Sequence, residues 1–224
     1  MVLGYLFSYG YVLFVLLLAV IADKFKLLSQ EGRRKLVHVL LVFTWVIMIT
    51  YLKGTIHLIV IPASFVLLNT VSYLKAKKAD GSAIPILSSM ERSGEEETPG
   101  TVYYALSIMI MGIITLIDET WFIPCGIGLF CMAFGDGMAG VVGKKARGIF
   151  ARHITGEKSL GGTLACIVFS IIGCELYLLL MGADPALAKI LIVSVMCAVL
   201  ELPGRGFDNL TVPFGSMLVA SLLF

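Results

Sequence analysis

The chain has 224 residues, of which 58% are hydrophobic and only 14% are charged. A chain this apolar, with a strongly positive mean hydropathy, needs the bilayer to solvate most of its surface. The formal net charge is only +2, and acidic residues interrupt the basic ones, which argues against a nucleic-acid partner. The composition therefore predicts an integral membrane protein and excludes a soluble domain or a nucleic-acid binder.

Eight apolar runs follow one another along the chain. They lie near residues 2 to 21, 36 to 52, 55 to 74, 99 to 117, 122 to 142, 161 to 182, 186 to 200 and 209 to 224. Because a membrane span needs roughly 20 residues, we expect one integral membrane domain over residues 1–224, an all-α polytopic bundle of about eight transmembrane helices. The first run lacks a basic leader and a small-residue cleavage site, so we interpret it as a retained helix.

The distribution of Lys and Arg predicts the orientation of this bundle. If the amino terminus is outside, Lys53 and Lys189 alone fall outside, which leaves fifteen of the seventeen basic residues on the inner side. Basic loops favour the cytoplasm. We therefore expect both termini on the non-cytoplasmic side, with cytosolic loops near residues 22–35, 75–98, 143–160 and 201–208. The sequence does not indicate an oligomeric state.

Asp136 lies inside the fifth apolar run. A carboxylate at membrane depth is costly, so its default interpretation is functional, although a buried structural ion pair is the alternative. Seven residues separate it from Gly143, which places it about 10 Å from the helix end. Gly137 and Gly140 flank it and would leave room for a metal ion or a phosphate. Other small residues are spaced for close helix packing, namely Gly135, Ala139 and Gly143.

Further polar clusters fall on the same predicted face as Asp136. They are Arg34, Lys35 and His38 at the second helix, Lys144, Lys145 and Arg147 after the fifth, Glu157, Lys158 and Ser159 before the sixth, and Asp208 and Asn209 at the eighth. Positive-inside anchoring and ordinary packing are the alternatives for the basic residues and for the histidine. Thr-Gly-Glu-Lys-Ser over residues 155–159 is not a Walker A loop, because no glycine directly precedes the lysine and we expect no strand before it.

These residue types indicate metal-assisted phosphate chemistry at the cytoplasmic boundary, with the active site facing the cytoplasm. Carboxylates suit Mg²⁺, and Lys or Arg neutralises phosphate oxygens. We expect Asp136, with Asp208 or Glu157, to hold Mg²⁺ against a nucleoside triphosphate, while a basic residue such as Lys158 neutralises the developing charge. A carboxylate with a raised pKa would accept the proton of the attacking hydroxyl.

Five short blocks stand in order between residues 34 and 213. They read RKLVH at 34–38, GTVYYAL at 100–106, GDGMAGVVG at 135–143, KSLGGT at 158–163 and DNLTVP at 208–213. The blocks resemble those of the CTP-dependent lipid-alcohol kinases, which include phytol, farnesol and dolichol kinases and the yeast-type diacylglycerol kinase. The resemblance implies transfer of the terminal phosphate of CTP, with Mg²⁺, to the hydroxyl of a membrane lipid alcohol.

The resemblance also assigns roles to individual residues. It implies that Asp136 is a metal ligand or the base and that Lys158 with Ser159 contacts phosphates, whereas Lys35, His38 and Asp208 match motif positions without an assigned role. Gly161 stands where dolichol kinases usually carry an acidic residue. The chain is thus more similar to phytol kinase, and we expect an isoprenoid acceptor such as phytol, farnesol, geranylgeraniol or a polyprenol.

Two other functions compete with this interpretation. A cytidylyltransferase that joins CMP to a lipid phosphate would also use CTP and Mg²⁺, and phosphatidate cytidylyltransferases distantly resemble the carboxyl-terminal half of the chain. A transporter would need polar residues across the whole bilayer, whereas Glu175 is the only ionisable residue expected deep in the membrane, where we interpret it as structural. The five cysteines lie in apolar runs without a C-x-x-C pair and are expected to be buried, inert thiols.

Overall fold

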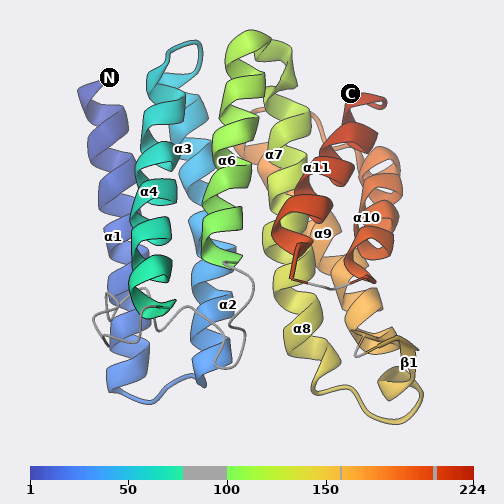
Figure 1. Ribbon diagram of the computed structural model, residues 1–224. Helices are drawn as coiled ribbons and strands as arrows, with labels where there is room; N and C mark the ends of the chain where they lie inside the picture. Colours follow the sequence, from blue (N-terminus) through green and yellow to red (C-terminus); the bar gives the residue numbers. More distant parts are fainter. Residues whose placement is uncertain (78–99, 157, 204–205) are drawn as a thin grey trace. The chain divides into compact units, whose positions relative to one another are not determined.

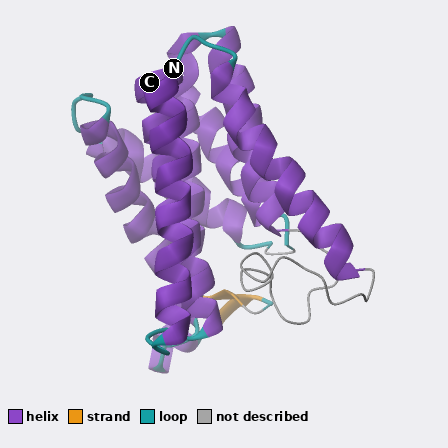
Figure 2. Cartoon of the chain, turned by 90° about the vertical axis from the view of Figure 1, so that its left-hand side faces the viewer, coloured by secondary structure: helices purple, strands orange, loops and turns teal. Residues whose placement is uncertain are grey.

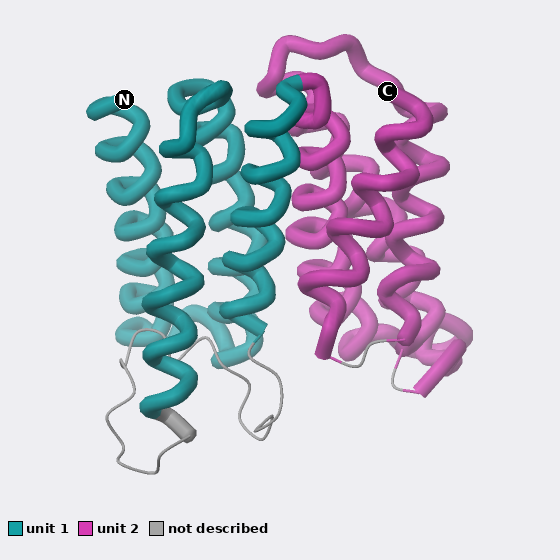
Figure 3. Tube along the Cα trace, turned by 45° about the horizontal axis from the view of Figure 1, so that its top comes forward, with its two compact units in different colours: residues 1–119 teal, residues 120–224 magenta. Residues whose placement is uncertain are grey.

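The computed structural model describes residues 1–77, 100–156, 158–203 and 206–224. The chain divides into two compact units, Met1–Glu119 and Thr120–Phe224, which Figure 3 colours separately. The single membrane domain expected from the sequence stays a prediction.

Within residues 1–77 and 100–119, the part of unit 1 that the structure describes, the chain forms five α-helices; Figure 1 labels them. They are α1 (Val2–Lys24), α2 (Gln30–Leu41), α3 (Phe43–Leu52), α4 (His57–Lys77) and α6 (Gly100–Ile117). Helix α1 packs against α2 and α3, and α4 packs against α6. The second helix begins six residues before the predicted apolar run, because the Ser29 side chain caps α2 by accepting a hydrogen bond of 3.2 Å from the Gly32 amide. The helical path is then interrupted at Val42, where α2 ends and α3 follows.

Unit 2 is built around a central helical rod. The rod consists of α7 (Phe122–Phe130), the π-helical turn η2 (Cys131–Asp136) and α8 (Gly137–Gly143), and the 3₁₀ turn η1 (Glu119–Trp121) leads into it across the boundary between the units. Around it pack α9 (Leu160–Leu180), α10 (Leu187–Glu201) and α11 (Asp208–Ser221). The rod is the core of the unit, since Leu129, Phe130 and Met132 are fully buried.

Glycines allow the rod to approach α9 closely. A Cβ atom at Gly162 of α9 would lie 3.0 Å from the Ala139 carbonyl oxygen of α8, and one at Gly143 would lie 3.3 Å from the Gly162 Cα. A Cβ at Gly135 would clash with the Ser170 hydroxyl of α9. The packing role predicted for the spaced small residues of the fifth helix is confirmed for Gly135 and Gly143.

The predicted polytopic helical architecture is confirmed. Within the described residues, six helical segments are long and apolar enough to cross a membrane. They are Val2–Lys24, Gln30–Leu52, His57–Lys75, Gly100–Ile117, Glu119–Gly143 and Leu160–Leu180. Helices α10 and α11 have 15 and 14 residues, and at 1.5 Å per residue both are shorter than a hydrocarbon core of about 30 Å. The side on which the termini lie stays a prediction.

A small β-hairpin joins α8 to α9, and Figure 2 shows it in orange. Strand β1 (His153–Thr155) pairs antiparallel with β2 (Lys158–Ser159). The 3₁₀ turn η3 (Gly148–Ala151) precedes it, and Gly156 in the connection has a φ of +51°. The expectation that no strand precedes Lys158 was wrong, because the pairing is only two register positions long and leaves no alternating pattern in the sequence.

Candidate active site

Asp136 lies at the end of the π-helical turn in the central rod. Asp136 is only 8% exposed, although its side chain is a carboxylate. A π turn holds one extra residue within a helix and occurs frequently at functional sites. The extra residue rotates the following residues about the helix axis relative to their positions in a regular α-helix. The π turn η2 therefore determines on which side of the rod the side chain of Asp136 lies.

Lys158 brings together the ends of three elements of unit 2. It lies in β2, and its ammonium group donates a hydrogen bond to the carboxylate of Glu201, the last residue of α10. It also forms an ion pair of 3.7 Å with Asp208, the first residue of α11. The short connection between α10 and α11 returns the chain to the same end of the unit, so the two carboxylates flank one lysine.

The charged groups of this cluster shift one another's pKa values. Burial lowers the pKa of Lys158, but the hydrogen bond to Glu201 and the charges of Glu201, Asp208 and Asp136 outweigh burial, and the net pKa is raised. Burial raises the pKa of Glu201, which lies outside the six candidate spans, to about 7; Lys158 opposes this shift, and Asp136 and Asp208 add to it. Asp136 therefore belongs electrostatically to the same cluster.

The cluster carries an excess of negative charge. Three carboxylates, those of Asp136, Glu201 and Asp208, act on the single ammonium group of Lys158. When all four groups are ionised, their formal sum is −2. Such a set attracts a cation, and Mg²⁺ in nucleotide sites is held by one or two carboxylates, with substrate phosphates and water completing its coordination.

The described residues do not form a dedicated metal cage. Among them, no group of three or more His, Cys, Asp and Glu side chains is placed to hold a metal ion. Of the predicted metal ligands, Asp136 and Asp208 lie in the Lys158 cluster, whereas Glu157 lies outside the described residues. The carboxylate oxygens of the cluster therefore fit a metal ion that arrives bound to phosphates, because such an ion needs fewer ligands from the protein.

Ser159 connects α8 to the start of α9. Its hydroxyl accepts a hydrogen bond of 3.3 Å from the Gly162 amide, which caps α9, and donates one of 3.3 Å to the Gly143 carbonyl oxygen. The Thr163 hydroxyl in turn donates to the Ser159 carbonyl oxygen at 3.2 Å. The residue predicted to contact phosphate is thus already engaged as a helix cap. It fixes the backbone directly after Lys158.

The other predicted residues of unit 2 have different surroundings. Gly137 is buried and Gly140 is half-buried, both in α8 just after Asp136. Asn209 follows Asp208 in the first turn of α11. The predicted phosphate-binding residues Lys144, Lys145 and Arg147 are exposed in the segment after α8.

Three predicted residues belong to α2 in unit 1. Lys35 is only 7% exposed, and Arg34 forms an ion pair of 3.9 Å with Glu31. The His38 ring lies edge-on to Tyr104, with ring centroids 4.8 Å apart, and the Tyr104 hydroxyl donates to the His38 carbonyl oxygen at 2.9 Å. These three residues thus lie together on α2 of unit 1, whereas the Lys158 cluster belongs to unit 2.

Glu201 is the functional candidate that sequence reasoning missed. It lies one residue beyond the predicted seventh apolar run and resembles an ordinary loop carboxylate, yet only 2% of it is exposed. One signal in the sequence points to it. In the sequence, Pro203 and Gly206 stand between Glu201 and Asp208, and these residue types favour a turn that would bring the end of one helix beside the start of the next.

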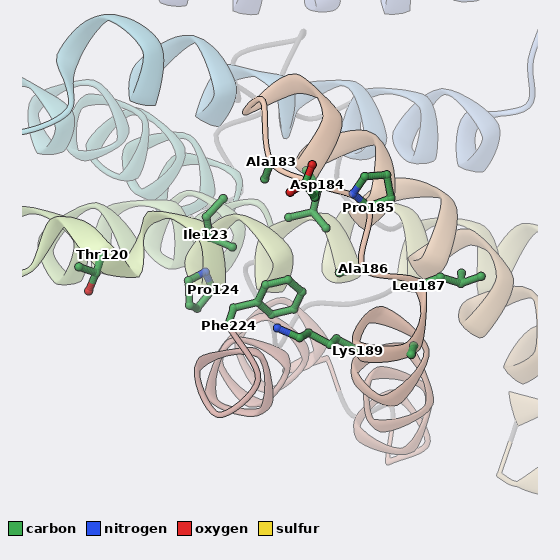
Figure 4. Close-up of a pocket in the computed structure, with 12 residues that line it drawn as sticks. Thr120, Ile123, Pro124, Ala183, Asp184, Pro185, Ala186, Leu187, Lys189 and Phe224 are labelled. Atoms are coloured by element: carbon green, nitrogen blue, oxygen red, sulfur yellow. The ribbon is translucent and has the colours of Figure 1, made fainter.

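The opposite end of α9 carries different features. Glu175 accepts hydrogen bonds of 3.3 and 3.4 Å from the Ala186 amide. Its structural role stays a prediction. A cavity of about 600 Å³ opens beside Ala186, and Figure 4 shows Asp184, Lys189 and Phe224 in its lining. The Lys189 ammonium lies 4.7 Å from the centre of the Phe224 ring. Helix α9 has 21 residues, so this cavity is about 30 Å from the Lys158 cluster.

All five cysteines are buried and free, as expected. Four of them lie in or beside the π turn, which begins at Cys131. The Cys131 and Cys174 sulfurs are 3.5 Å apart, and those of Cys166 and Cys197 are 3.7 Å apart. They pack the rod against α9 and α10.

Fold and site together define a polytopic helical membrane protein with a partly buried carboxylate–lysine cluster at one end of its second unit. No family model and no solved structure matches the chain. Its curated relatives are phytol kinases, which confirms the resemblance to the lipid-alcohol kinases.

Three of these relatives show the extent of the similarity. The phytol kinase of Synechocystis is 35% identical over 145 residues, which cover 61% of this chain and 59% of the relative. A probable chloroplastic phytol kinase of Triticum aestivum is 29% identical over 89% of this chain and 69% of its own length. The chloroplastic phytol kinase 1 of Arabidopsis thaliana is 25% identical over 90% and 69%, respectively. The chain thus spans between about three fifths and two thirds of the length of these proteins.

Proposed function

We propose that this chain is a kinase that transfers the γ-phosphate of CTP to the hydroxyl group of a membrane lipid alcohol, with an isoprenoid alcohol such as phytol as acceptor. The observation that carries the proposal is the cluster of Asp136, Lys158, Glu201 and Asp208 in a homologue of phytol kinases. A lysine held among carboxylates at one end of a membrane-spanning unit offers both the positive charge and the oxygen ligands that phosphoryl transfer uses.

Lys158 supplies the positive charge in this mechanism. Its ammonium group is held by Glu201 and Asp208, on helices α10 and α11. A lysine fixed in this way loses less conformational freedom when it binds a phosphate oxygen, and its raised pKa keeps it protonated. Ser159 supports this position, because it anchors the residue after Lys158 to both α8 and α9.

Asp136 and Asp208 are the residues that would hold Mg²⁺. When bound, the ion would neutralise charge on the β- and γ-phosphates of the nucleotide. Both carboxylates raise the pKa of Lys158, so each lies within electrostatic reach of the place where a phosphate would meet the lysine. Gly137 directly follows Asp136, and Gly140 lies about one helical turn further along α8, so neither position adds a side chain beside the carboxylate.

The reaction itself requires one new bond and one broken bond. The oxygen of the lipid alcohol bonds to the γ-phosphorus, the bond from that phosphorus to the bridging oxygen breaks, and CDP leaves with the electron pair. The hydroxyl proton passes to a carboxylate of the cluster. Asp136 serves as this base or as a metal ligand, and both duties require its ionised carboxylate.

The test uses the purified full chain in liposomes with Mg²⁺, a panel of phytol, farnesol, geranylgeraniol, a polyprenol and phosphatidate, and CTP labelled at either the α or the γ phosphorus. Extraction into organic solvent then separates lipid products. We expect label from the γ position alone, in an alcohol phosphate. Label from the α position alone would mean a cytidylyltransferase, and an absence of label from both would contradict the CTP kinase.

A donor series and an acceptor series refine the result. ATP, GTP and UTP replace CTP at equal concentration, and the labelled products identify the preferred alcohol. We expect CTP and an isoprenoid alcohol to give the highest kcat/KM. Diacylglycerol is added to the acceptor panel for this series, and a preference for it or for phosphatidate would reject the proposed acceptor class.

A further inference from the structure

The segment between α8 and α9 is strongly basic. Residues 144–156, here called the basic segment, contain Lys144, Lys145, Arg147 and Arg152 and no acidic residue. All four of these cations belong to exposed residues. The segment therefore presents a local charge of +4, in contrast to +2 for the entire chain.

Large apolar side chains are exposed in the same segment. Ile149 is 73% exposed, Phe150 48% and Ile154 44%. The segment lies outside the six candidate membrane spans, so the lipid contacts of a transmembrane helix do not explain this exposure. The turn η3 thus carries two adjacent apolar residues and has cations on both sides of it in the sequence. Segments that combine exposed apolar residues with cations in this way bind at membrane interfaces.

The backbone holds these side chains in a defined arrangement. The Arg152 carbonyl oxygen accepts a hydrogen bond of 2.9 Å from the Leu160 amide, and the Thr155 hydroxyl donates one of 3.1 Å to the Leu202 carbonyl oxygen. A Cβ atom at Gly161 would lie 3.2 Å from the Phe150 carbonyl oxygen, so η3 rests directly on the start of α9. The exposed side chains are thus presented from an anchored turn.

Both ends of the basic segment are attached to candidate spans. The preceding span ends at Gly143, and the following span begins at Leu160. The segment is therefore held within a few residues of the membrane boundary at each end. Figure 1 shows the same connection near the lower ends of α8 and α9, where β1 is labelled.

We propose that the basic segment is a membrane-contact surface, which inserts Ile149 and Phe150 into the interface of an anionic leaflet while its four cations bind lipid phosphates. Apolar insertion and attraction to anionic lipid strengthen each other in such segments. The long stems of Lys and Arg let their charged ends stay at the phosphate level while neighbouring apolar residues lie deeper.

Binding of nucleotide phosphates is the other use that these cations offer. It accounts for the charge but leaves Ile149 and Phe150 in water, whereas an anionic leaflet matches both. The membrane-contact surface does not depend on the kinase proposal, because it requires only the spans and the exposed residues of the basic segment.

The test measures depth in the bilayer and not activity. Ile149→Cys is labelled with an environment-sensitive fluorophore in the full chain, where all five native cysteines are fully buried. The protein is placed in nanodiscs of phosphatidylcholine alone or with phosphatidylglycerol, with quenching nitroxides at shallow or deep lipid positions. We expect a blue-shifted emission and strong shallow quenching, both increased by phosphatidylglycerol.

Ala151→Cys is the matched control, because a 3₁₀ helix has three residues per turn and Ala151 therefore lies on a different side of η3 from Ile149. We expect its label to be quenched less. The double variant Lys145→Gln/Arg152→Gln removes two of the four cations. We expect phosphatidylglycerol to increase the equilibrium constant for insertion of the Ile149 label about 30-fold less in this variant.

Two results would overturn the proposal. One is an Ile149 label that stays in water in both lipid compositions. The other is an Ile149 label whose emission responds to Mg²⁺ and CTP but not to phosphatidylglycerol, which would assign the cations to nucleotide.

Discussion

At the scale of single residues, Asp136 is the most sensitive position of the proposed active site. It is buried and lies in the same electrostatic cluster as Lys158 and Glu201. Replacement by Asn keeps the size and removes the charge, so we expect Asp136→Asn to lower the kinase rate by roughly 100-fold or more. The rate of γ-phosphate transfer to lipid, measured with folded protein, checks this expectation.

Asp184→Asn is the control for this variant. Asp184 lines the cavity at the other end of α9, so its replacement should leave the rate unchanged. Size-exclusion profiles and thermal unfolding of both variants establish folding. A largely active Asp136→Asn protein would remove this residue from the proposed mechanism.

Glu201 gives the cluster a pH dependence whose sign follows from its pKa. Folding raises this pKa from 4.5 to about 7, so the folded protein binds the proton more tightly than the unfolded chain does. The stability gained in this way is fully present below pH 4.5 and is lost as the pH rises through about 7. We therefore expect wild type to lose stability relative to Glu201→Gln across this interval, by at most about 3 kcal/mol.

Thermal unfolding of both proteins at the two ends of the interval measures this change. Lys158 adds no opposing slope there, because its own pKa is raised above 10.5. A constant difference between wild type and Glu201→Gln across the interval would contradict the raised pKa.

At the scale of elements, the contact between α8 and α9 depends on the absence of side chains. A Cβ atom at Gly162 would lie 3.0 Å from the Ala139 carbonyl oxygen, which is backbone and cannot rotate away. We expect Gly162→Val to destabilise the protein by about 1–3 kcal/mol. Because Ser159 caps α9 in the same turn, the variant should also displace Lys158 and lower activity.

Gly10→Ala in α1 is the matched glycine control for that prediction. Nothing lies within 4 Å of a Cβ at this position, so the change should be neutral or stabilise by up to about 1 kcal/mol through helix propensity. Thermal unfolding in detergent measures both variants. Equal stability of Gly162→Val and Gly10→Ala would show that α8 and α9 separate without cost.

The same elements show what the sequence predicts and what it does not. The spaced small residues correctly predicted close packing of the fifth helix, and Asp208 does begin the last helix. The π turn was not predictable, because Cys131 to Gly135 are apolar or small and no polar face marks the extra residue. Glu201 was missed because its burial arises from tertiary contacts with Lys158, which no local pattern records.

At the scale of the whole molecule, hydropathy was the most informative property of the sequence. Eight apolar runs correctly predicted a polytopic helical protein. They could not show that the last two helices would have only 15 and 14 residues, because helix ends depend on turns such as the one after Glu201. Nor does hydropathy reveal that the chain forms two compact units, since each unit contains strongly apolar spans, with mean hydropathies from 1.6 to 2.2 in both.

The orientation of unit 2 in the membrane leads to a final prediction. The excess of Lys and Arg in the loops predicts that the basic segment lies in the cytoplasm and that the turn with Asp184 lies on the other side. Helix α9 separates these two places by 21 residues, enough to span the bilayer. We expect a membrane-impermeant thiol reagent to label Asp184→Cys in intact cells, and Arg152→Cys only after the cells are opened. The native cysteines are fully buried and should add little background. Labelling of Arg152→Cys in intact cells would mean that the predicted topology is inverted. The proposed active site would then not face the cytoplasm, because Lys158 lies at the same end of α9 as the basic segment.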